Sequence, residues 1–139
     1  MKLDADVTVV SDMIERAFNR GDLSAVDDLL LPAATDHQEA PGVNFPQHLK
    51  GVVTMLRTAF PDLHFEIKHI MSSGDVVAMH SVMTGTHLGP LRDLPATRRG
   101  VRVRHMHFVR IEQGRGAELW HLWDTPSMMK QLTGPAPTA

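Results

Sequence analysis

The spacing of the apolar residues changes at Pro61, from the period of a helix to the period of a strand. Before Pro61, apolar residues recur every three to four positions over residues 5–20 and 46–60, which predicts two amphipathic helices. A shorter helix is expected over residues 23–31, and residues 33–43 are expected to be irregular. The first half of the chain is therefore predicted to be mainly helical.

After Pro61, apolar and polar residues alternate, as they do along strands. Strands are expected over residues 63–72, 76–87, 101–112 and 117–124, followed by a short helix over 127–132. The segment 88–100 holds two glycines, two prolines and four charges, which is typical of an exposed loop. Helices followed by a run of long strands predict an α+β fold. In it a curved antiparallel sheet wraps over the N-terminal helices around a central pocket.

Length and charge narrow the classes of protein that fit. A chain of 139 residues suits one domain, expected over residues 1–132 with a flexible tail over 133–139. No apolar run approaches the roughly 20 residues that span a bilayer, and the acidic N-terminus lacks the basic region of a signal peptide. A formal net charge of −2 disfavours nucleic acid as a partner. We therefore expect a cytoplasmic protein that binds neither membranes nor nucleic acid.

Three of the nine histidines gather on one face of the final predicted hairpin. Pairing Ile111 with Ala117 across the turn sets the register of the two strands. This register places the following residues opposite one another on one face: Val109 and Leu119, His107 and His121, His105 and Trp123. The face is otherwise apolar, and desolvation disfavours the charged form of a histidine, so these imidazoles are predicted to be neutral and able to act as bases. A nearby acid, Asp124 or Asp36, would oppose that shift.

Two other interpretations of the three histidines stay open at this point. They can be structural residues that satisfy one another by hydrogen bonds. They can also bind a metal, since His105 and His107 share a strand face and His121 offers a third ligand. No carboxylate falls in the same stripe, so a metal is not expected to be required. The absence of cysteine, of a G-x-S-x-G motif and of a glycine-rich phosphate loop argues against several other enzyme classes.

Five segments resemble, in order and spacing, the SnoaL-like polyketide cyclases and the broader ester cyclase branch of the NTF2-like superfamily. They are AFPDLHFEI, SSGDVVAMHS, GTHLGPLRDLPATRRGVRV, HMHFVRIEQGRG and ELWHLWDTPSMMKQL. The resemblance runs from about residue 5 to Leu132. It implies an α+β cone with a cavity inside, no cofactor, and a homodimer or homotetramer. The cyclases close a ring by intramolecular aldol condensation on a polycyclic aromatic polyketide ester.

The resemblance also suggests roles for individual residues. It places a pocket histidine of the cyclases at His107 and their catalytic aspartate at His121. An imidazole can still abstract an acidic proton next to a carbonyl, although its basic form carries no negative charge. We therefore predict acid/base catalysis on a hydrophobic carbonyl compound, with His121 transferring the proton, His107 orienting it or stabilising the enolate, and Asp124 assisting. Five substrate-binding residues are expected: His37, His87, His105, Trp123 and Met83.

Two alternatives to this function remain. One is a ligand-binding cone without catalysis, whose histidines only satisfy one another. The other is a hydrolase or hydroxylase of the same fold, because one fold can carry many chemistries.

Overall fold

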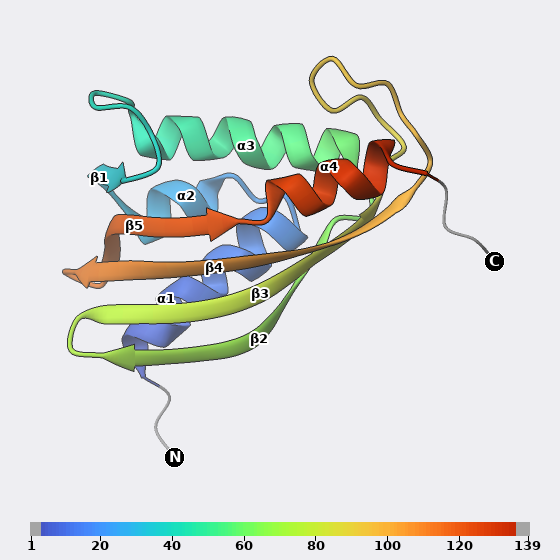
Figure 1. The fold of residues 1–139 in the computed structure, drawn as a ribbon. Coiled ribbons are helices and arrows are strands. Elements are labelled where there is room, and N and C mark those ends of the chain that lie inside the picture. Colours follow the sequence, from blue (N-terminus) through green and yellow to red (C-terminus); the bar gives the residue numbers. More distant parts are fainter. Residues whose placement is uncertain (1–3, 136–139) are drawn as a thin grey trace.

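A curved sheet of five strands carries helices on one side in the computed structural model, which describes residues 4–135 (Figure 1). In chain order the elements are α1 (Ala5–Met13), a π-helical segment (Ile14–Asn19), α2 (Ser24–Leu29), β1 (Leu30–Asp36), α3 (Phe45–Ala59), β2 (His64–Ser73), β3 (Val76–Thr86), β4 (Gly100–Glu112), β5 (Arg115–Trp123) and α4 (Thr125–Thr133). The predicted α+β fold is confirmed. Of the tail expected over 133–139, residues 136–139 lie outside the described residues.

The sheet is mixed, because one edge strand runs parallel to its neighbour. The strand order is β1-β5-β4-β3-β2, with β1 parallel to β5 and the other neighbours antiparallel. The expectation that residues 33–43 are irregular is wrong for the part that forms β1. Pro32 is tolerated because β1 is an edge strand. The pairing of β1 with β5 shifts between Leu30 and Thr35, so this strand lacks the regular alternation by which the other strands were predicted. Its last residue, Asp36, pairs with Leu119 of β5.

The predicted register of the final hairpin is correct at the histidines and wrong next to the turn. Three predicted pairs are confirmed: Val109 with Leu119, His107 with His121, and His105 with Trp123. Ile111, however, pairs with Gly116 and not with Ala117. The register shifts between Arg110 and Ile111, where a β-bulge places one extra residue in β5. Beyond the bulge, from Arg110 back toward His105, the pairing follows the predicted register. The three histidines therefore lie on one face of the sheet.

The helices follow the sequence pattern with two adjustments. The helix expected over residues 5–20 is an α-helix only to Met13 and continues as the π-helical segment. Helix α3 begins as expected, with the side chain of Asn44 accepting a hydrogen bond from the Gln47 N–H and Pro46 in the first turn. Helix α4 begins two residues earlier than expected, because Asp124 caps its N-terminus.

The core lies between the helices and the inner face of the sheet. Val10, Val53 and Leu56 of the helices pack there with Met83 and Val103 of the strands. No helix among residues 4–135 is long and apolar enough to cross a bilayer. The outer face of the sheet exposes several large apolar side chains, namely those of Met71, Met106, Phe108, Trp120 and Leu122.

Candidate functional site

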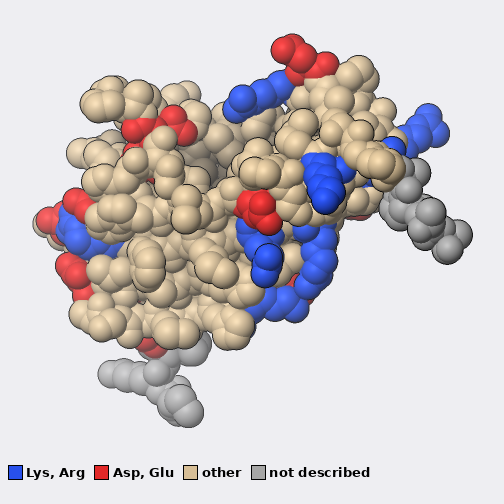
Figure 2. All heavy atoms as spheres, viewed as in Figure 1, with Lys and Arg blue, Asp and Glu red and all other residues tan. Residues whose placement is uncertain are grey.

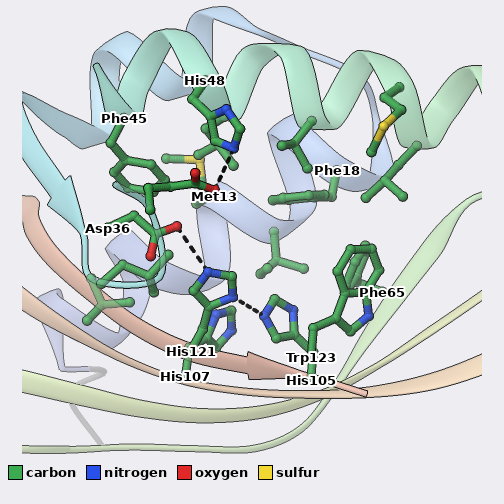
Figure 3. Close-up of a pocket in the computed structure, with 18 of the residues that line it drawn as sticks. Met13, Phe18, Asp36, Phe45, His48, Phe65, His105, His107, His121 and Trp123 are labelled. Carbon is green, nitrogen blue, oxygen red and sulfur yellow. Dashed lines mark hydrogen bonds and ion pairs between the residues drawn. The ribbon is translucent and has the colours of Figure 1, made fainter. Parts of the chain in front are cut away.

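A cavity of about 730 Å³ lies between the helices and the inner face of β4 and β5 (Figure 3). This volume is within the range of small-molecule sites. Most of its lining is apolar and comes from α1, the π-helical segment, α3 and the sheet. Aromatic rings contribute on several sides, from Phe18, Phe45, Phe65 and Trp123. The cavity therefore suits a hydrophobic ligand.

The three histidines predicted to face inward do line this cavity. They belong to a hydrogen-bonded chain that begins at Asp36, the last residue of β1 (Figure 3). Asp36 Oδ2 lies 3.0 Å from Nε2 of His121, and Nδ1 of His121 lies 2.9 Å from Nε2 of His105. The side chain of Asp36 is 4% exposed and that of His121 is 21% exposed. The strand that the sequence pattern did not reveal thus supplies the carboxylate that is hydrogen-bonded to His121.

Asp36 is ionised, and this determines which ring nitrogens of His121 and His105 carry a proton. Burial by itself would raise the pKa of Asp36, but hydrogen bonds from His121 and from the Gln38 N–H outweigh it and hold the pKa below its usual value. A carboxylate can only accept a hydrogen bond, so the Nε2–H of His121 donates to it. The Nδ1 of neutral His121 then accepts from the Nε2–H of His105. We assign these tautomers from the hydrogen bonds.

Two of the three histidines are neutral at any working pH. Burial, followed by the neighbouring His107 and His121, lowers the pKa of His105 to about 2. Burial and His121 lower the pKa of His107 to about 3. Three buried nitrogens of this wall have no hydrogen-bond partner in the described part of the chain: His105 Nδ1, His107 Nε2 and Trp123 Nε1. Buried polar groups are normally paired, so these atoms are places where a ligand or water would bind.

A second histidine–carboxylate pair lines the same cavity from the helical side. Nε2 of His48, in the first turn of α3, lies 2.8 Å from Oε1 of Glu39 (Figure 3). Glu39 follows β1 by three residues, in the turn that leads to α3. The sequence pattern offered no signal for this pair, because the contact joins a segment expected to be irregular to a helix.

Two predicted site residues do not line the cavity. Asp124, expected to be catalytic, accepts a hydrogen bond from the Ser127 N–H at 3.2 Å and serves as the N-cap of α4. Met83, expected to bind substrate, is fully buried in the core on β3. The reason is local in both cases. The side chain of Asp124 is turned toward the N-terminus of α4, which it caps, and the side chain of Met83 is covered by the helices that pack on the sheet.

His37 and His87 also lie away from the cavity. His37 is on the exposed side of the turn after β1, where its ring stacks on Trp120 with centroids 4.7 Å apart. His87 is fully buried, and its Nδ1 lies 3.0 Å from Oγ1 of Thr97. Burial lowers the pKa of His87, so it is a neutral structural residue that ties β3 to the loop before β4.

The site has no arrangement of ligands for a metal ion. Within residues 4–135, no group of three or more histidine, aspartate or glutamate side chains could hold one. His105 and His121 direct ring nitrogens at each other, as hydrogen-bonded partners do. The chemistry that this arrangement supports on its own is proton transfer.

The depressed pKa values of the buried histidines predict a loss of stability in acid. His105 and His107 bind protons near pH 6.5 when the chain is unfolded, but only near pH 2–3 when it is folded. Their contribution is therefore complete above pH 6.5 and is lost as the pH falls, by about 1.4 kcal/mol per pH unit for each group. We expect His107→Gln to reduce by that amount the slope of unfolding free energy against pH between 6 and 4, measured in urea. Equal slopes in both proteins would contradict the assignment.

Comparison with known proteins points to one family. The family model described as SnoaL-like polyketide cyclase matches residues 8–132. The aklanonic acid methyl ester cyclase DauD of Streptomyces sp. (strain C5) is 28% identical over 142 residues, which cover 98% of this chain and 86% of DauD. The solved structure of TsrD from Streptomyces laurentii has a TM-score of 0.84 at 23% identity, covering 96% of this chain and all of TsrD. The solved structure of IdmH from Streptomyces antibioticus, a proposed polyketide cyclase, has a TM-score of 0.79 at 28% identity, covering 91% of this chain and 97% of IdmH. This chain belongs to the SnoaL-like polyketide cyclase family.

Proposed function

We propose that this protein closes a carbon ring on an aromatic polyketide ester by intramolecular aldol addition, with His121 as the acid/base group and without a cofactor. The observation that carries the proposal is the hydrogen-bonded chain Asp36–His121–His105 on the wall of a largely apolar cavity. Membership of the cyclase family and the names of the curated relatives, which are aklanonic acid methyl ester cyclases, support the same substrate class.

The first step removes a proton from the carbon next to a substrate carbonyl. With its Nε2–H donated to Asp36, His121 has its basic electron pair on Nδ1. In the free protein this pair accepts from His105, and in the complex the substrate C–H takes that place. The proton moves to Nδ1 and the C–H electron pair moves into the enolate. The carboxylate of Asp36 stabilises the imidazolium that forms, as the buried acid does in a catalytic triad.

The negative charge that develops on the enolate oxygen is best stabilised by hydrogen-bond donors that are already in position, because they need not reorganise during the reaction. His105 offers the Nε2–H that the substrate has displaced from His121. His107, as the Nε2–H tautomer, offers a second donor that no other described residue uses. Because their low pKa values keep both rings neutral, each can donate without first acquiring a proton.

Asp36 explains how an imidazole can serve at the position where the family resemblance places an aspartate. A neutral imidazole alone carries no negative charge to balance the proton it takes up. The carboxylate of Asp36, 3.0 Å away, provides that charge from the neighbouring strand. The proposed base is therefore the Asp36–His121 pair, and Asp36 is its positioning and charge-balancing member.

A ligand-binding cone without catalysis is the second candidate. It is favoured by the fact that both ring nitrogens of His121 have partners in the free protein. Under this alternative an aromatic ligand binds, quenches the fluorescence of Trp123 and is recovered unchanged. Formation of a cyclised product by the purified protein would exclude it.

We also propose that the protein assembles through the outer face of the sheet into a homodimer or homotetramer. Met106, Phe108 and Leu122 on this face are 54%, 55% and 75% exposed. Figure 2 shows a broad uncharged surface over the strands, with basic side chains gathered below α4. A contiguous apolar patch on one face marks an interaction site.

Substitutions at the proposed base are expected to lower turnover of aklanonic acid methyl ester. His121→Ala removes the proton acceptor and should reduce kcat by about 10²- to 10⁴-fold. Asp36→Asn keeps the shape but removes the charge that balances the imidazolium, and a loss of similar order is expected. Both are measured by following the product chromatographically.

The control for these variants is His64→Gln, on an exposed histidine at the start of β2. It should react at the wild-type rate and unfold at the same temperature. Wild-type turnover by His121→Ala or by Asp36→Asn would contradict the proposed base.

The proposed assembly predicts a particle of two or four times the 15.4 kDa chain mass by light scattering after size exclusion. Phe108→Glu places a charge in the apolar face and should shift the protein toward the monomer. Leu88→Glu, at an equally exposed apolar residue in the loop before β4, is the matched control and should not. A monomeric wild-type protein would rule out the assembly.

A further inference from the structure

The cavity contains a second histidine–carboxylate pair that the mechanism above does not use. Glu39 and His48 are joined at 2.8 Å and both line the cavity. Figure 3 shows His48 reaching in from α3 while His121 rises from the sheet on the other side. The two histidine–carboxylate pairs therefore belong to different walls of one ligand site.

A single turn positions the carboxylates of both pairs. The backbone N–H of Glu39 donates to the carbonyl oxygen of Asp36 at 3.1 Å, and the N–H of Gln38 donates to Asp36 Oδ1 at 2.8 Å. The next residue after β1, His37, is fixed to β5 through the carbonyl oxygen of Leu119 at 2.9 Å. The turn thus directs Asp36 to the sheet and Glu39 to the helix.

An aldol ring closure requires two proton transfers at different atoms. A base takes a proton from carbon, and an acid gives a proton to the oxygen of the carbonyl that is attacked. His121 is held to its wall by two hydrogen bonds, which suits the first transfer. The second transfer occurs at the far end of the new carbon–carbon bond.

We infer that Glu39 and His48 form the acid half of the reaction, binding the oxygen of the attacked ketone and protonating it as the ring closes. This inference rests on the proposed cyclase function and adds the residues that receive the acceptor end of the substrate.

The step balances without any further reactant. The enolate carbon forms a bond to the ketone carbon, and the carbonyl π pair moves onto oxygen. That oxygen takes a proton from the His48–Glu39 pair. Solvent then returns a proton to this pair and removes one from His121. The net change moves one hydrogen from carbon to oxygen, so the reaction is an isomerisation.

The surroundings of His48 suit an acid that is recharged in each cycle. Glu39 Oε1 lies 2.8 Å from His48 Nε2 and places a negative charge beside this ring, next to the positive end of the α3 dipole. The side chains of His48 and Glu39 are 38% and 33% exposed, so solvent can reach them, unlike the buried His105 and His107. The charged groups of the cavity wall that can act on the pair are Asp36, Arg92, Asp93, Glu118 and His121.

Deuterium exchange separates the two halves of the reaction. Aklanonic acid methyl ester is incubated in D₂O with each protein, and mass spectrometry follows two quantities, deuterium at the acidic carbon above the uncatalysed rate and cyclised product. His48→Gln and Glu39→Gln should retain exchange within about threefold of wild type and lower ring closure by about 10²-fold or more. His121→Ala should lose both activities.

Three controls keep the outcomes distinct. Far-UV circular dichroism and the unfolding temperature confirm the fold of each variant, and KM reports binding. His64→Gln should behave as wild type. Ring closure at the wild-type rate in both His48→Gln and Glu39→Gln would overturn the inference alone, as would parallel loss of exchange and closure. A wild-type protein that does neither reaction would contradict the proposed function itself.

Discussion

The hydrogen bond between Asp36 and His121 is the interaction on which the candidate site depends. It joins the end of the parallel edge strand β1 to His121 near the end of β5, with 3.0 Å between Asp36 Oδ2 and His121 Nε2. Without it, no carboxylate of the described residues would be hydrogen-bonded to the three imidazoles, which could then bind a ligand but could poorly balance a transferred proton. With it, His121 has a fixed tautomer and a partner for its charged form. In the proposed mechanism, this one strand pairing gives the histidine cluster the charge partner that an acid/base group requires.

The cavity that contains this group is obtained at some cost to stability. Neutral histidines stand where a protein of this size would otherwise pack aliphatic side chains, and three of the ring nitrogens on that wall lack a partner in the described part of the chain. The low pKa values of His105 and His107 are the electrostatic consequence of the same burial. Local features that disagree with good packing mark functional sites in many proteins. The same desolvation keeps both rings neutral, and neutral rings can donate to an enolate.

Much of the fold could be predicted from the sequence, and part of the site could not. Alternation along β4 and β5 revealed which face holds His105, His107 and His121, because strand periodicity is a local property. It offered Asp36 only as one of two possible nearby acids and could not place it, because the strand that carries Asp36 contains Pro32, lies at an edge and shows no alternation. The position of Asp124 was missed for a related reason: it caps α4, and that helix begins two residues before the expected boundary.

The role assigned to Asp36 can be measured directly by nitrogen-15 NMR of the histidine side chains at neutral pH. The account predicts that His121 carries its proton on Nε2, with a strongly deshielded N–H resonance that disappears in Asp36→Asn, while His105 stays neutral in both proteins. A His121 that carries its proton on Nδ1, or whose spectrum is unchanged in Asp36→Asn, would show that the carboxylate does not hold the imidazole and would contradict the account.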